Sequence, residues 1–186
     1  TVANAGGKVV KNVAGYDLGK LACGSRGRLA LIARASFRLH PLPKVVRTLV
    51  VETSDAAGVV AALLHSQLEP SSLDVLHPGR AAVLFEGSEG AVEAQMTAAH
   101  RLVGGEEVGP QIWAEARVRQ GTAHGRVRFA PGKLGELLAR LSEAVVRPVA
   151  GVAYTAETQP SEADDSSRRL EERIFLAFDP KGVLAA

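Results

Sequence analysis

Between residues 44 and 104 the sequence alternates between two kinds of apolar pattern. Short segments rich in valine and similar residues predict strands, and segments whose apolar residues recur every three or four positions predict amphipathic helices. The predicted elements are a strand at 45–52, a helix at 55–68, strands at 72–76 and 81–85, and a helix at 88–103. This order predicts an α+β fold of the split βαβ, or ferredoxin-like, type, in which helices cover an antiparallel sheet. It does not match the doubly wound parallel sheet of a nicotinamide-binding domain.

Cap and turn residues mark the ends of these elements. Asp55 can cap the first helix, and Pro70 is expected to end it. His77-Pro78-Gly79 is typical of a turn between two strands. Gly104-Gly105 is expected to end the second helix.

The pattern continues less regularly after residue 109. The predicted elements are a helix at 110–120, a strand at 125–129, a helix at 134–144, a strand at 145–154 and a helix at 168–178. Residues 155–167 are polar and predict a loop or a disordered stretch.

The first 43 residues are different in character, with glycines close together and few helical patterns. A short helix is predicted from Leu18 to Ala22, ending at Gly24-Ser25, and residues 29–39 predict a strand. Pro41 and Pro43 end that strand, because proline has no N–H to donate to a neighbouring strand. The sequence therefore predicts two domains, residues 1–43 and residues 44–186, the second ending in a helix.

Composition excludes several classes of function. The chain has 46% apolar and 23% charged residues, which is typical of a globular protein, and its net charge of +2 is too small to suggest a nucleic-acid partner. The single cysteine, Cys23, excludes an internal disulfide and a cysteine metal cluster. No apolar run approaches the roughly 20 residues of a membrane span. We expect a cytoplasmic protein, with any contact to the inner membrane made through partners.

The segment with specific chemistry is K-N-V-A-G-Y-D-L at residues 11–18, followed by G-S-R-G-R-L at residues 24–29. The glycines around Ser25 allow positive φ and a close approach of the backbone, which suits a long ligand that carries phosphate. The Ser25 hydroxyl can donate to such a ligand, and Lys11 can contribute positive charge. A Gly-Ser-x-Gly sequence alone is a weak signal, and turn glycines between a helix and a strand are the alternative.

This segment resembles the last part of the FAD-binding domain of the FAD-linked oxidases, the family of vanillyl-alcohol oxidase, D-lactate dehydrogenase and glycolate oxidase. The family pattern is K-N-x-x-G-Y-D-L, a short spacer, and G-S-x-G-x-L-G-x-I. The variant present here is most similar to the FAD-binding E subunits of bacterial glycolate oxidases. The closing A-F-D-P-K-G-V-L at residues 177–184 is similar to the C-terminal signature of the same subunits.

The resemblance implies the end of a VAO/PCMH-type FAD-binding domain followed by a ferredoxin-like cap domain. The positions that it places near the flavin are Lys11, Asn12, Gly15, Tyr16, Gly24, Ser25, Gly27 and Ile32. Ala30 stands where the family usually has glycine. The family's main pyrophosphate-binding loop would lie upstream of Lys8, so we expect a truncated chain that is inactive by itself.

The activity that the resemblance implies is that of an FAD-binding subunit in a complex that oxidises glycolate or D-lactate. Its implied partners are a catalytic flavin subunit and an iron–sulfur subunit. The His-x-Gly-Asp-Gly-Asn-type motif of related catalytic subunits does not occur, and no catalytic or metal-binding residue is predicted here. The alternative is a flavin-free assembly module that docks partner subunits through its cap domain.

Several further residues have more than one interpretation. The five histidines show no metal-ligand spacing and are expected on the surface or at caps. Cys23 is expected to be a small buried residue beside the cofactor loop. Trp113 is expected to be an anchor in the core or at an interface. Four arginines suggest either a basic patch for an anionic ligand or an acidic partner, or simply solvated faces, which we favour. They are Arg117, Arg119, Arg126 and Arg128.

Overall fold

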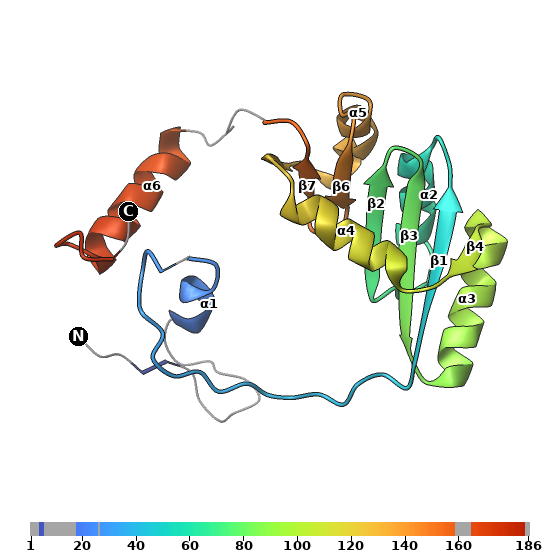
Figure 1. The fold of residues 1–186 in the computed structure, drawn as a ribbon, viewed down its shortest axis with the longest axis horizontal. Helices are drawn as coiled ribbons and strands as arrows, with labels where there is room; N and C mark the ends of the chain where they lie inside the picture. Colours follow the sequence, from blue (N-terminus) through green and yellow to red (C-terminus); the bar gives the residue numbers. More distant parts are fainter. Residues whose placement is uncertain (1–3, 6–17, 26, 159–164, 185–186) are drawn as a thin grey trace. The chain divides into compact units, whose positions relative to one another are not determined.

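The computed structural model describes residues 4–5, 18–25, 27–158 and 165–184. Contacts divide the chain into two units, the first formed by Thr1–Leu39 with Glu162–Ala186 and the second by His40–Ser161 (Figure 1). These units differ from the two domains expected above, because they group the C-terminal helix with the N-terminal segment. The domain limits at residues 43 and 44 stay a prediction.

The second unit contains an antiparallel sheet, so the α+β class is confirmed. Among the described residues seven strands form this sheet, in the order β4-β1-β3-β2-β6-β7-β5. The strands are β1 (Val45–Glu52), β2 (Ser72–His77), β3 (Arg80–Gly87), β4 (Glu106–Val108), β5 (Gly125–Arg128), β6 (Ala144–Arg147) and β7 (Val152–Thr155). Each paired strand runs antiparallel to its neighbour.

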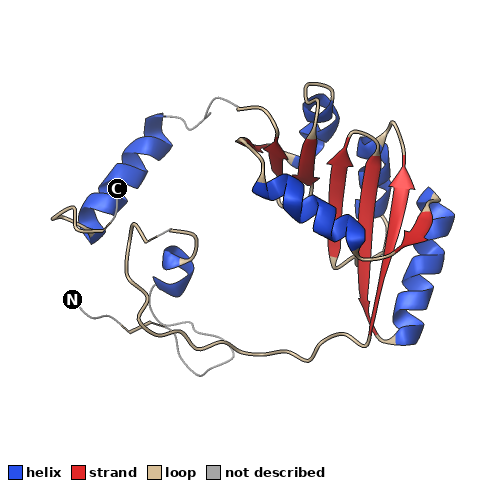
Figure 2. Ribbon diagram, viewed as in Figure 1, coloured by secondary structure: helices blue, strands red, loops and turns tan. Residues whose placement is uncertain are grey.

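Helices cover both faces of the sheet (Figure 2). The helices of this unit are α2 (Ala56–Leu64), α3 (Glu89–Val103), α4 (Gln111–Gly121), the 3-10 turn η1 (Pro131–Lys133) and α5 (Leu134–Leu138). Helices α2, α3 and α5 pack with one face of the sheet in the main core, which includes Leu49, Val75 and Phe85. Helix α4 packs on the other face, where Ile112 and Ala116 join a smaller cluster. Burial of these apolar side chains drives the assembly of the unit.

In the described part of the first unit the helices are α1 (Leu18–Ala22) and α6 (Asp165–Phe178). The Arg28 guanidinium lies 3.8 Å from the centre of the Phe175 ring, and the side chain of Leu29 is buried. After α6, Asp179 accepts hydrogen bonds from the backbone N–H groups of Val183 (2.9 Å) and Leu184 (2.6 Å). The closing A-F-D-P-K-G-V-L sequence thus contains a carboxylate-capped turn, whereas the contact to the segment after α1 is made by Phe175 of α6.

The strand predicted at residues 29–39 is wrong. Residues 30–43 form neither helix nor strand, and the side chains of Leu31, Phe37 and Leu39 are more than 80% exposed. The apolar pattern of a strand is present, but a strand also needs a neighbour to complete its backbone hydrogen bonds. No neighbour pairs with this segment among the described residues.

The single strand predicted at 145–154 is also wrong, because the structure has a hairpin of β6 and β7 there. Pro148 interrupts the segment, and Gly151 turns the chain with a φ of 61°. The backbone N–H of Ala150 donates to the carbonyl of Arg147 at 3.1 Å and closes the turn. Proline and a left-handed glycine are turn residues whose signal outweighs the valine content of this stretch.

Other helices and strands begin or end at residues that differ from the predicted ones. The helix predicted at 55–68 ends at Leu64, because the Ser66 hydroxyl donates to the carbonyl of Leu63 (2.6 Å) and competes with the helical bonds. The helix predicted at 134–144 ends at Leu138, and Ala144 already belongs to β6. Within the loop predicted at 155–167, Thr155 belongs to β7 and α6 begins at Asp165. Strand β4 was not predicted.

Candidate functional site

The glycine loop after α1 has the backbone conformation that the sequence predicts. Gly24 and Gly27 have φ values of 82° and 83°, in the left-handed region. The N–H of Ser25 donates to the carbonyl of Ala22 (3.1 Å), and the carbonyl of Ser25 accepts from the N–H of Arg28 (3.0 Å). The N–H groups of Gly24 and Gly27 donate to no acceptor in the described part of the chain. Within the described residues, these two backbone donors are thus without an acceptor.

The described residues leave the two glycines uncrowded. None of their heavy atoms lies within 4 Å of the position that a Cβ would take at Gly24 or Gly27. Glycine is required here by the backbone conformation and not by crowding. A ligand can approach the two glycines without displacing a side chain of the described residues.

Half of the residues predicted near the flavin can be located. Lys11, Asn12, Gly15 and Tyr16 lie outside the described residues. Gly24, Ser25 and Gly27 lie together in the loop. Ile32 lies in the extended segment that follows and is 62% exposed. Contact of all eight with a flavin stays a prediction.

Cys23 is exposed, so the prediction of a buried thiol beside the loop is wrong. It follows α1, a helix of five residues with no buried side chain. A helix this short cannot bury a residue at its end unless another element covers it.

On the α4 face of the sheet, arginines and glutamates form an ion-pair cluster. Arg80 contacts Glu115 through both terminal nitrogens, one of them at 3.0 Å. Arg119 lies 2.8 Å from Glu115 and 3.2 Å from Glu143, and it also donates to the carbonyl of His77. The hydrogen bond from Arg80 holds the pKa of the Glu115 carboxyl below its usual value. This cluster ties α4 to β2 and β3 and leaves its charges compensated.

A second polar group on this face surrounds a buried carboxylate. The side chain of Asp74 is only 7% exposed, and its closest cation is Arg147, whose Nε lies 3.8 Å from Oδ2. Burial raises the pKa of Asp74, and the charge of Arg147 counteracts part of this rise. Arg147 donates to Gln120 at 2.7 Å, and its guanidinium lies 5.6 Å from the centre of the Tyr154 ring.

Sequence reasoning missed Asp74 and Arg147. An acid in the middle of the apolar run S-L-D-V-L was the available signal for Asp74. Its pairing with Arg147 depends on the register between β2 and β6, which aligns Val75 with Val146. That register links residues far apart in the sequence, so local patterns do not reveal it.

The four arginines suggested as a basic patch do not share one environment. Arg119 belongs to the ion-pair cluster, and Arg117 is exposed on α4. Arg126 and Arg128 are exposed on β5, at the edge of the sheet.

Of the two positions expected for Trp113, the structure supports the core, because the half-buried side chain packs against the smaller core cluster. Its indole N–H donates to the hydroxyl of buried Thr48 at 2.9 Å, which fastens α4 to β1.

Three histidines bind backbone carbonyls: His65 that of Ala61, His77 that of Leu141 and His124 that of Ala156. The expected surface or capping position is found for His65, the C-cap of α2, and for exposed His124, whereas His77 is half-buried on β2. No three metal-ligating side chains gather anywhere in the part of the chain that the structure describes.

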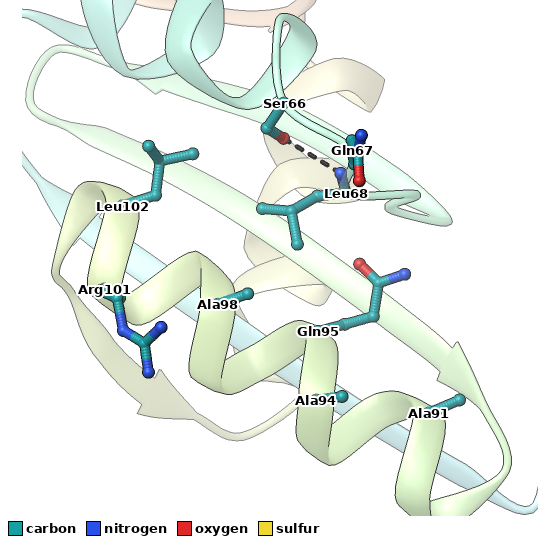
Figure 3. Close-up of a pocket in the computed structure, with 9 residues that line it drawn as sticks. All are labelled: Ser66, Gln67, Leu68, Ala91, Ala94, Gln95, Ala98, Arg101 and Leu102. Atoms are coloured by element: carbon teal, nitrogen blue, oxygen red, sulfur yellow. Dashed lines mark hydrogen bonds between the residues drawn. The ribbon is translucent and has the colours of Figure 1, made fainter.

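The described residues of the sheet unit line at least two hollows. One, of about 630 Å³, lies along α3 and the turn after α2, and Ala91, Ala94 and Ala98 line it (Figure 3). Another, of about 650 Å³, contains Asp55 and His77. Asp55 caps α2 through the N–H of Gly58 (2.8 Å), and His77 binds the Leu141 carbonyl. Both polar side chains therefore have structural partners, and neither hollow presents an evident catalytic group.

Known proteins resemble a large part of this chain. It is 37% identical over 117 residues to glycolate oxidase subunit GlcE of Escherichia coli, which covers 62% of this chain and 32% of that protein. It is 37% identical over 78 residues to glycolate oxidase subunit GlcD of Bacillus subtilis. It is 35% identical over 78 residues to D-lactate dehydrogenase of Archaeoglobus fulgidus. The last two matches each cover 40% of this chain and 17% of the relative.

The resemblance to the glycolate oxidase family of FAD-linked oxidases that was seen in the sequence is thereby confirmed. The chain spans about a third of the length of GlcE. No family model and no solved structure matches it. Among the described helices, none has the length and apolar character needed to cross a membrane.

Proposed function

We propose that this chain is the FAD-binding part of a subunit in a complex that oxidises a small 2-hydroxyacid such as glycolate or D-lactate. The observation that carries the proposal is the match to glycolate oxidase subunit GlcE, together with the left-handed Gly24 and Gly27 loop that follows the K-N-V-A-G-Y-D-L sequence. The names of the other relatives, a glycolate oxidase subunit and a D-lactate dehydrogenase, support the same substrate class.

The loop fits a phosphate-bearing cofactor. The N–H groups of Gly24 and Gly27 have no acceptor in the described chain, and the Ser25 hydroxyl adds a third donor. Backbone donors presented by a glycine-rich turn bind phosphate oxygens well, because no side chain keeps the anion away. We assign these three residues, with Lys11, Asn12, Gly15, Tyr16 and Ile32, to the FAD site. When bound, FAD supplies the two-electron acceptor for oxidation of the hydroxyl carbon.

The sheet unit supports a ferredoxin-like cap domain that begins at residue 44, after the end of the FAD-binding domain at residue 43. Its first elements are β1, α2, β2, β3, α3 and β4, and their strand order is β4-β1-β3-β2. Helices α2 and α3 pack in one core on the same face. This is the arrangement expected of two split βαβ units. Strands β6, β7 and β5 extend the sheet beyond β2.

The chain requires partners to act. We propose a catalytic flavin subunit, which houses the base for the substrate, and an iron–sulfur subunit, which receives electrons. No residue of the described chain is assigned a catalytic role. The alternative is a flavin-free assembly module that docks the same partners through the cap domain.

FAD binding separates the two proposals. The chain is titrated with FAD while flavin fluorescence and absorbance are followed. We expect saturable binding of one FAD per chain, weakened at least tenfold by Gly24→Val combined with Gly27→Val, since tenfold corresponds to about 1.4 kcal/mol. Gly182→Val is the matched control, because Gly182 also has a positive φ (63°) in the same unit but lies outside the loop.

Far-UV circular dichroism checks that each variant keeps its fold. Absence of saturable binding to the parent chain would contradict the flavin proposal. If the loop variant and Gly182→Val weaken FAD binding equally, the loop is not part of the FAD site.

A further inference from the structure

Strand β5 has one open edge. It is the last strand of the sheet and pairs only with β7 among the described residues. The N–H of Phe129 donates to the carbonyl of Gly151 at 2.9 Å. This bond shows which residues at the end of β5 direct their backbone groups toward β7. Backbone groups alternate between the two edges of an antiparallel strand, so the N–H and C=O groups of Arg126 and Arg128 face away from β7.

The side chains of Arg126 and Arg128 share one face of the sheet. Val127, between them, packs against the main core on the opposite face. Successive side chains alternate between the faces of a strand, which places both arginines on the α4 face, about 7 Å apart along the strand. Arg126 lies 5.9 Å from the centre of the Tyr154 ring, which limits the directions that its guanidinium can take.

These two arginines differ from the other arginines of the sheet in having no carboxylate partner in the part of the chain that the structure describes. Arg47, Arg80 and Arg147 each lie within 4.0 Å of a glutamate or aspartate. Arg126 and Arg128 form no ion pair with any described residue, and both are exposed. Considered with the described residues alone, the open edge therefore combines unpaired backbone groups with two uncompensated positive charges in a fixed spacing.

We propose that the edge of β5 receives an extended acidic segment of a partner polypeptide, which adds an eighth strand to the sheet. Backbone hydrogen bonds to Arg126 and Arg128 supply the attachment. Carboxylates at alternate positions of the segment lie opposite the two guanidinium groups, where opposite charges on adjacent strands stabilise the pair. The residue between them lies beside Val127, which is half-buried, so an apolar side chain fits there.

Self-association through this edge is disfavoured. A second copy pairing β5 with β5 would place arginines beside arginines, and like charges on adjacent strands repel. The opposite edge of the sheet, β4, carries Glu106 and Glu107, but both carboxylate oxygens of Glu107 bind Arg47 of the same chain. We therefore take a different polypeptide as the occupant. This inference does not depend on FAD binding.

The test uses the full 186-residue chain and a short fluorescein-labelled peptide in which glutamate alternates with valine. Fluorescence anisotropy measures binding. We expect saturable binding, loss of binding when lysine replaces glutamate, and at least tenfold weaker binding when the peptide amides on its binding edge are N-methylated. N-methylation removes the backbone donors and leaves the charge unchanged.

Variants of the protein complete the test. Arg126→Glu combined with Arg128→Glu is expected to weaken peptide binding at least tenfold. The control is Arg117→Glu combined with Arg140→Glu, which makes the same change of charge at exposed helical or loop positions. It is expected to change peptide binding less than twofold. Absence of binding overturns the proposal. Equal losses of peptide affinity in the two double variants would show that only general charge attraction is at work. Peptide affinity that does not change on N-methylation would show the same, and either result overturns the proposal.

Discussion

Asp74 is a buried acid whose nearest cation is too distant for a hydrogen bond. Its Oδ2 lies 3.8 Å from Nε of Arg147, and desolvation raises its pKa. A carboxyl with a raised pKa in the folded state holds its proton to a higher pH than in the unfolded state. The folded state therefore binds more protons, and the free energy of unfolding falls as pH rises from the unfolded pKa through the folded one.

Replacing Asp74 by asparagine removes this titration. The free energy of unfolding of Asp74→Asn, minus that of the parent, is expected to increase as pH rises above about 3.8, the ordinary value of the group. Urea titrations at a series of pH values measure it. Asp55→Asn is the matched control, because asparagine also caps helices and the Asp55 side chain is exposed. A difference that is constant or declines with pH would contradict this account.

The bond between Trp113 and Thr48 gives a second prediction. Thr48→Val leaves the indole N–H without its acceptor and is expected to cost about 1 kcal/mol, the net value of a typical hydrogen bond. Thr48→Ser keeps the hydroxyl and is expected to cost less. Trp113 is the only tryptophan, so its fluorescence during urea unfolding reports this interface directly. Equal losses in the two variants would show that the hydroxyl contributes nothing.

At the scale of elements, the sequence pattern predicted a helix or strand correctly where residue propensity and tertiary packing favour the same structure. The limits of β1 match the prediction, because its valines have strong β propensity and its neighbours bury Val50 and Val51. Residues 29–39 have a strand pattern without a pairing strand in the described chain, and so form none. Pro148 and Gly151 divided one predicted strand into two, which turn chemistry could have shown.

The turn between β6 and β7 depends on Gly151. A Cβ at this position would lie 2.6 Å from the carbonyl oxygen of Phe129, and the φ of 61° is unfavourable for other residues. Gly151→Ala is expected to lower the free energy of unfolding by roughly 1–3 kcal/mol. Gly121→Ala, at the end of α4 with no atom within 4 Å, is the control. Urea denaturation compares them, and similar stabilities would contradict the required conformation.

At the scale of the whole molecule, the chain combines a well-packed sheet unit with a segment whose apolar side chains are exposed. The positive φ of Gly24 and Gly27 could be predicted from the glycines alone, and the family from the motif around them. The environment of Asp74 and the open edge at β5 could not, because both depend on strand register and order. The sequence thus indicates the cofactor segment, while the three-dimensional arrangement reveals the polar groups of the sheet.

The most direct test of the account is hydrogen exchange of the 186-residue chain with and without saturating FAD. We expect FAD to slow exchange in peptides that cover residues 18–32, where Gly24, Ser25 and Gly27 lie, and to leave the sheet strands β1 and β3 unchanged. Slower exchange at the loop would place the flavin where the account puts it. Bound FAD that protects only the sheet unit, or leaves residues 18–32 unchanged, would contradict it.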